Sequence, residues 1–285
     1  MTAQTFQGFL LTRDWRDTGD GIELEYWFAT GQGPLQVLVR GERAVFFLPL
    51  SQLPMARELL AGQRGVEFKP VELRDFHMQP VCGIYFPAYR VARGAADILR
   101  EAGLEPLEAD INPADRHLME RFVAGAALLL GEAKTRGRHL QLRNPGLKSG
   151  DFRPRLRVVS FDIETAMEGL QLYSIAVDGR YGGEQVRRVF MLGEGADQDF
   201  VSAYGSQGEV LQAFQDWIAE YDPDVLIGWN VVNFDCWYLQ RLSEHLGRRL
   251  LLGRERRPAN WRELDDDGER RAVRLPGRVV LDGIE

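Results

Sequence analysis

The chain has 285 residues, of which 45% are hydrophobic and 27% charged, and its formal net charge is −7. This length allows two domains with cores of their own, and the lack of any apolar run of about 18 residues excludes a membrane-spanning helix. The first residues show neither the basic start nor the apolar run of a signal peptide. Cys82 and Cys236 are the only cysteines and lie far apart, so we expect no zinc site and no disulfide framework, which suits a reducing cytoplasm.

Residues 1–140 predict a small, strand-rich α+β domain, because short β-biased runs alternate with helical patterns. The expected strands cover residues 6–12, 22–30, 35–40, 44–48, 66–73 and 81–89, and the expected helices 51–60, 92–102 and 113–123. The aromatic residues of the first fifty positions form either a core or a platform for stacking nucleic-acid bases, and their strand spacing favours a core. They are Phe6, Phe9, Trp15, Tyr26, Trp27, Phe28, Phe46 and Phe47.

Residues 141–157 predict a basic linker between two domains, because prolines, glycines and cations accumulate there. The cations of residues 134–157, which include the segment just before this linker, are Lys134, Arg136, Arg138, Arg143, Lys148, Arg153, Arg155 and Arg157. A second basic run contains Arg248, Arg249, Arg254, Arg256 and Arg257. Each run either contacts a DNA backbone or is a solvated surface, and the second interpretation is favoured for both.

The most informative feature follows the linker, where Asp162 and Glu164 interrupt an apolar run that predicts a strand. Side chains two residues apart share one face of a strand. Two carboxylates side by side on a half-buried strand repel each other, and a bound divalent cation relieves that repulsion. The pair therefore indicates half of a hard-metal site, although two solvated acids at a strand end would give the same spacing.

The second half of the site lies about 70 residues further on, after the short apolar strand 225–227. Gly228 permits a tight exit from that strand, and Asp235 falls near the start of a helical pattern over residues 234–246. An acid in a first helical turn is also favoured by the helix dipole alone. Further strands are expected at 170–177 and 186–192, a helix at 209–221, and a solvated hairpin tip at 263–269.

The motifs Asp162-Ile163-Glu164 and Asn230-x-x-x-Phe234-Asp235 resemble the first two exonuclease motifs of the family B DNA polymerases, and they also fit the wider DEDD exonucleases. The resemblance extends to residues 8–18, 75–81 and 221–225, which look like bacterial members of the family. It implies that residues 158–285 form an incomplete ribonuclease-H-like 3′–5′ exonuclease domain.

The resemblance also implies a mechanism and partners. Asp162 would bridge two Mg²⁺ ions, for which Mn²⁺ may substitute, Glu164 and Asp235 would each hold one, and Asn230 and Phe234 would position the terminal nucleotide. Asn230 could equally be a turn residue or helix cap, and Phe234 a core residue. The expected partners are a single-stranded 3′ DNA end, a primer-template, deoxynucleotides and a sliding clamp, in DNA repair or damage-tolerant synthesis.

Part of the family pattern is missing from the sequence. The family site has one more Asp, preceded four residues earlier by Tyr; no such pair follows Asp235, and Asp282 lacks the pattern. The polymerase motifs are missing too, so we expect a piece that ends inside the exonuclease domain and is inactive or very weak alone. The alternatives are a freestanding DEDD exonuclease, which should contain its last Asp, and a non-catalytic nucleic-acid-binding module, which has no reason to bind metal.

Overall fold

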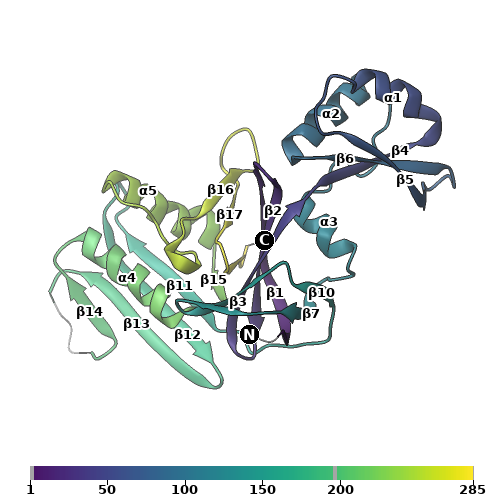
Figure 1. Cartoon of the computed structure of the whole chain (residues 1–285). Helices are drawn as coiled ribbons and strands as arrows, with labels where there is room; N and C mark the ends of the chain where they lie inside the picture. The colour runs from purple at the N-terminus through teal and green to yellow at the C-terminus, as the bar shows by residue number, and fades with distance from the viewer. Residues whose placement is uncertain (1–2, 195–197, 285) are drawn as a thin grey trace. The chain divides into compact units, whose positions relative to one another are not determined.

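The computed structural model describes residues 3–194 and 198–284. The chain divides into two compact units, Met1–Phe152 and Arg153–Glu285 (Figure 1). Residues 195–197 and 285 of the expected exonuclease range, and residues 1–2 of the expected N-terminal domain, lie outside the described residues. In the described part of the chain, no helix is both long and apolar enough to cross a bilayer.

The larger sheet of the first unit has the strand order β10-β7-β1-β2-β3-β9-β8. Its strands are β1(Gln4–Thr18), β2(Gly21–Thr30), β3(Gly33–Glu42), β7(Ala126–Gly131), β8(Lys134–Arg136), β9(His139–Arg143) and β10(Gly146–Ser149). The hairpins β1–β2 and β2–β3 close by the same device, in which the Oγ1 of Thr18 or Thr30 donates to the carbonyl oxygen of Gly21 or Gly33 over 2.7 Å. Both glycines have positive φ, +117° and +104°, which side chains rarely adopt.

A smaller sheet of order β4-β6-β5 is inserted between β3 and β7. It contains β4(Ala44–Pro49), β5(Glu67–Arg74) and β6(Pro80–Phe86), with the 3₁₀ turn Leu50–Gln52 and the helices α1(Leu53–Leu59) and α2(Tyr89–Glu101). The next helix, α3(Pro113–Met119), packs on β1 and β2 of the larger sheet. The expected strand 81–89 is three residues too long, because α2 already begins at Tyr89. The carboxylate of Asp17 accepts the N–H groups of Tyr89 and Arg90 at 2.7 and 3.1 Å, and so caps this helix from the end of β1.

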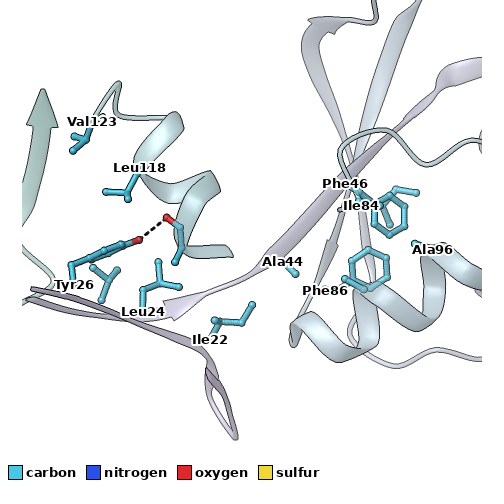
Figure 2. Close-up of a cluster of buried hydrophobic side chains, with 14 of the residues drawn as sticks. Ile22, Leu24, Tyr26, Ala44, Phe46, Ile84, Phe86, Ala96, Leu118 and Val123 are labelled. Carbon is cyan, nitrogen blue, oxygen red and sulfur yellow. Dashed lines mark hydrogen bonds between the residues drawn. The ribbon is translucent and has the colours of Figure 1, made fainter. Parts of the chain in front are cut away.

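The core of the first unit continues from the larger sheet into the smaller one. Figure 2 shows Tyr26 of β2 reaching α3, where its hydroxyl donates to the carbonyl oxygen of Ala114 over 3.0 Å, and Phe46 and Phe86 packed at the smaller sheet. The interpretation of the aromatic residues as core is confirmed for those that are at most 3% exposed, which are Phe6, Tyr26, Trp27, Phe28 and Phe46. Phe9, at 36%, remains exposed.

The expectation of a linker at 141–157 is wrong for its first part, because residues 141–149 belong to the larger sheet. β9 runs parallel to β3 with Leu142 fully buried, and β10 pairs with β7. The cations Arg143 and Lys148 are exposed, and each follows a less exposed leucine in its strand. A basic composition describes a solvated edge strand as well as a linker, which explains the error. Apart from the short link Asn144-Pro145 between these strands, only residues 150–157 of the expected linker lack regular structure.

The second unit contains a sheet of order β14-β13-β12-β11-β15-β18. Its strands are β11(Val158–Thr165), β12(Leu172–Tyr181), β13(Glu184–Leu192), β14(Val201–Tyr204), β15(Val225–Gly228) and β18(Val279–Asp282). β12 is antiparallel to β11 and β13, whereas β15 is parallel to both β11 and β18. The predicted succession of three strands, helix, strand and helix is present, and the sequence analysis missed β14 and β18.

The helices of this unit are α4(Gln207–Tyr221) and α5(Trp237–His245), the latter preceded by the π-helix η2(Val231–Cys236). The Oγ of Ser206 accepts the N–H of Glu209 and caps α4. The predicted helix 234–246 therefore starts three residues earlier than expected and begins as a π-helix. A separate hairpin, β16(Asn260–Glu263) and β17(Arg271–Arg274), contains the predicted acidic tip.

The second basic run is only in part the solvated surface that the sequence favours, because one of its arginines is buried. Arg254, in the 3₁₀ turn Arg254–Arg256, is 4% exposed and donates to Asp222 over 3.0 Å and to Asp224 over 2.7 Å. Arg278 also donates to Asp222, over 2.9 Å. On the surface, Arg256 pairs with Asp216 at 2.7 Å.

Candidate metal centre

The site begins on β11, where side chains alternate between core and surface. Val159, Phe161 and Ile163 are at most 4% exposed, whereas Asp162 and Glu164, which alternate with the last two of them, are exposed. The two carboxylates therefore share a face of the strand, as predicted. They lie in more solvent than the half-buried environment that we expected, which weakens their mutual repulsion.

The neighbouring strand β15 stops early and leaves room for the second half of the site. It pairs with β11 only from Val158 to Ser160, after which the chain turns away at Gly228. A Cβ atom on Gly228 would lie 2.8 Å from the Cβ of Val231 and 2.9 Å from the carbonyl oxygen of Phe161. This close approach requires glycine, as the predicted tight exit implied.

Asp235 occupies the space beyond the end of β15 and binds directly to β11. It is 1% exposed, and its Oδ1 accepts the backbone N–H of Ile163 over 3.0 Å, between Asp162 and Glu164. Its Oδ2 is also buried and has no hydrogen-bond partner among the described residues. A buried carboxylate oxygen without a partner is costly, so this atom marks a place where a cation or a proton is required.

The electrostatics of Asp235 agree with its geometry. Burial, followed by the negative charge of Asp162, raises the pKa of Asp235 from the ordinary value of an aspartate to about 7. The backbone N–H of Ile163 acts in the opposite direction and stabilises the charged form. Near neutral pH the side chain is therefore divided between its protonated and charged forms, and a nearby cation would favour the charged one.

The two residues predicted to hold a nucleotide lie at either end of the same turn. Asn230 adopts the left-handed conformation, with φ 57° and ψ 26°, that asparagine tolerates better than most residues. It stands at the N-cap position of η2, yet its side chain makes no capping bond. Phe234 is 43% exposed, which argues against its interpretation as a core residue. Both side chains are therefore available to a ligand.

Sequence reasoning missed the part played by Asp282. Its Oδ2 accepts the N–H of Val232 in η2 over 2.9 Å, and its charge adds to the rise in the pKa of Asp235. Asp282 lacks the tyrosine of the family pattern, so the motif alone does not select it. The available signal was the apolar strand that ends at this Asp, because carboxyl ends of parallel strands meet at one edge of a sheet.

The structure therefore brings together Asp162, Asp235 and the turn with Asn230, whereas Glu164 shares only the strand face. Among the described residues, no three His, Cys, Asp or Glu side chains are gathered closely enough to hold a metal ion without movement. The donor set still fits a hard cation, because it consists of carboxylates and includes the unpartnered, buried Oδ2 of Asp235.

A sheet with β11 at its centre and acidic residues beyond the end of β15 are consistent with the ribonuclease-H-like fold class. A family model described as "DNA polymerase family B, exonuclease domain" matches residues 137–285. Two others, "DNA polymerase II, N-terminal" and "DNA polymerase II, insertion domain", match residues 8–42 and 44–104. The chain belongs to the family B DNA polymerases.

Among its relatives is DNA polymerase II of Escherichia coli K12, which is 40% identical over 284 residues, or 98% of this chain and 35% of that protein. A DNA polymerase of Thermococcus gorgonarius is 34% identical over 129 residues, which cover 45% of this chain and 16% of the relative. The family B polymerase structure of Pyrobaculum calidifontis aligns with a TM-score of 0.73 at 24% identity, covers 97% of this chain and 36% of that one, and supports the fold. The chain thus spans 35% of its bacterial relative.

Proposed function

We propose that the chain forms the N-terminal and proofreading part of a DNA-directed DNA polymerase that removes nucleotides from a 3′ DNA end, in DNA repair or damage-tolerant synthesis. One observation carries the proposal. Asp235 is buried against the strand of Asp162 and Glu164, with one oxygen bound to Ile163 and the other without a partner in the described structure. That arrangement has no evident structural purpose, and it suits a carboxylate that awaits a cation.

Asp162, Glu164 and Asp235 would hold two Mg²⁺ ions, or Mn²⁺ in their place. When bound, such ions activate water and neutralise the leaving 3′ oxygen. Asp235 must lose its proton to act as a ligand, and its pKa of about 7 makes that loss easy near neutral pH. The N–H of Ile163 then orients the carboxylate so that its second oxygen is presented to the cation.

The substrate would be held by the turn before Asp235. The amide of Asn230 can bond to the sugar or base of the terminal nucleotide, and the exposed ring of Phe234 offers an apolar surface to it. These contacts favour an unpaired 3′ end, because a paired terminal base must first be separated from the opposite strand before it can reach the turn. We expect low activity from these 285 residues alone, because the sequence lacks the Tyr-x-x-x-Asp pair of the family site.

The test compares the chain with its Asp162→Ala/Glu164→Ala variant by Mn²⁺ titration and by incubation with a 5′-labelled single strand. The expected result is Mn²⁺ binding by the unsubstituted chain alone and little cleavage by either protein. Equal Mn²⁺ binding by both proteins would overturn the metal centre. Strong 3′ cleavage that is lost in the variant would support the centre and contradict the expected weakness.

A freestanding exonuclease is less well supported, because residues 8–42 and 44–104 match N-terminal and insertion models of DNA polymerase II. Use of deoxynucleotides and a primer-template, and contact with a sliding clamp, are proposed from family membership. A cytoplasmic location is proposed too, and Cys82 and Cys236 are consistent with it because both are free thiols.

A further inference from the structure

The helix that carries Asp235 begins without a cap of its own. The first N–H groups of any helix lack partners within it, and the residue at the N-cap usually supplies one through its side chain. Here Asn230 stands at that position but makes no such bond. The N–H of Val232 therefore needs a partner from elsewhere in the fold.

Asp282 supplies that partner from a strand 50 residues away. Its Oδ2 accepts the N–H of Val232 over 2.9 Å, and its Oδ1 accepts the N–H of Ile284 over 3.1 Å. Because each oxygen already has a backbone donor, the carboxylate is oriented toward η2 at one end and toward its own strand end at the other. This use of both oxygens is typical of a positioning residue.

The backbone around Asp282 is itself fixed by hydrogen bonds and packing. β18 is parallel to β15, with Asp282 opposite Gly228, and the N–H of Gly283 donates to the carbonyl oxygen of Gly228 over 2.8 Å. A Cβ atom on Gly283 would lie 3.0 Å from the indole ring of Trp229. The end of β18 is thus packed against the residues that lead directly into Asn230 and η2.

The same arrangement occurs at a helix remote in sequence from the metal centre. α2 begins after Ala88, which has no side-chain acceptor, and the carboxylate of Asp17 accepts the N–H groups of Tyr89 and Arg90. Asp17 lies in the other compact unit. It therefore offers a matched control, in which a helix loses a carboxylate cap without any change near Asp235.

We propose that Asp282 is a positioning residue of the exonuclease centre, which caps η2 and thereby holds Asp235 on Ile163 and leaves the Asn230 amide free for substrate. This inference rests on the proposed function. Asp282 acts through the backbone of Val232 and is not itself a metal ligand. Residues that orient metal ligands typically change metal affinity by about 10–100-fold when they are removed.

The experiment compares the full 285-residue chain with Asp282→Ala, Asp282→Asn and Asp17→Ala. Asp282→Asn removes the charge but keeps an oxygen that can accept the N–H of Val232. We expect Asp282→Ala to weaken Mn²⁺ binding about tenfold, and the other two variants to bind almost as well as the unsubstituted chain. If Asp282→Ala does not fold, Asp282→Glu displaces the carboxylate by one methylene and provides the same test.

Unchanged Mn²⁺ affinity in Asp282→Ala would overturn the proposal. Complete loss of binding in both Asp282 variants would overturn it as well, because the carboxylate would then be a ligand. An equal loss in Asp17→Ala would point to a general loss of stability and would also contradict it.

Amide hydrogen exchange separates this inference from the proposed function. If the unsubstituted chain binds no Mn²⁺, the proposed function fails, but the positioning of Asp235 is still decided by exchange in residues 231–236. Faster exchange there in Asp282→Ala than in Asp282→Asn supports the proposal, and equal exchange overturns it.

Discussion

The Oδ1 of Asp235 accepts the backbone N–H of Ile163 over 3.0 Å, which fixes the helical acid between the two acids of β11. A single hydrogen bond thus joins two motifs that lie 72 residues apart in the sequence. It also determines the chemistry of the second oxygen, which is buried and faces a site for a proton or a cation.

The stability of the chain should depend on pH through Asp235. Burial and Asp162 raise its pKa from 3.8 to about 7, so the folded state keeps a proton that the unfolded state has lost. The contribution of Asp235 to the free energy of unfolding is therefore full below pH 3.8 and is lost as the pH rises through about 7. Asp235→Asn should therefore gain stability relative to the unsubstituted chain between pH 4 and pH 8, by up to about 4 kcal/mol.

Urea denaturation of both proteins across this range measures the difference. Added Mn²⁺ serves as the control, because it should stabilise only the protein that retains Asp235, and most strongly above pH 7. A constant difference between the two proteins from pH 4 to pH 8 would contradict the assignment.

The charge of Asp162 should contribute to the raised pKa of Asp235. Asp162→Asn removes the second largest cause of the raised pKa, so the pKa of Asp235 should fall while burial keeps it above 3.8. Glu164→Gln is the matched control, because Glu164 is not among the causes of the shift. Carbon NMR of the Asp235 carboxyl group across a pH titration measures both, and an equal fall in the two variants would count against the closeness of Asp162 and Asp235.

Phe234 should matter for binding and not for folding. Its ring is 43% exposed, so Phe234→Ala should cost less than about 1 kcal/mol of stability and still weaken the binding of a single-stranded oligonucleotide. Phe214, which is fully buried in the same unit, provides the contrast, since Phe214→Ala should cost about 3–5 kcal/mol. Urea denaturation and fluorescence anisotropy measure the two effects, and unchanged oligonucleotide affinity in Phe234→Ala would exclude the ring from the substrate site.

Replacing Arg254 should cost far more stability than replacing Arg256, although the two residues lie at either end of one short turn. Arg254→Met leaves Asp222 and Asp224 with fewer buried partners and should cost about 3–5 kcal/mol. Arg256→Met breaks only a surface pair with Asp216 and should cost about 0–1 kcal/mol. Thermal unfolding measures both. Similar costs would mean that the buried cluster is not what fixes this part of the second unit.

The sequence allowed the prediction of features that depend on a few adjacent residues. The alternation around Asp162, the exit at Gly228 and the hairpins of the first unit are all local patterns, and each lies where it was expected. The missed elements, β7, β8, β9, β10, β14 and β18, are short strands, and three of them pair with strands distant in sequence: β7 with β1, β9 with β3, and β18 with β15. Their pairing is stabilised by contacts across the sheet, which no short window of sequence contains.

Contacts between distant segments also limit what the sequence predicts of the candidate site. Asp162, Glu164 and Asp235 could be named from motifs, and the availability of Asn230 was left open because a cap and a ligand contact use the same amide. The answer depends on Asp282, which supplies the cap from another strand.

The order of strands in the first unit has a consequence for synthesis on the ribosome. β1 pairs with β2 as soon as both have emerged, but its other neighbour, β7, begins only at Ala126, after the whole inserted sheet. At roughly 5–20 residues per second, one edge of β1 stays unpaired for about 5–20 s in every nascent chain. An unpaired strand edge readily joins other chains, so this interval exposes the growing protein to aggregation.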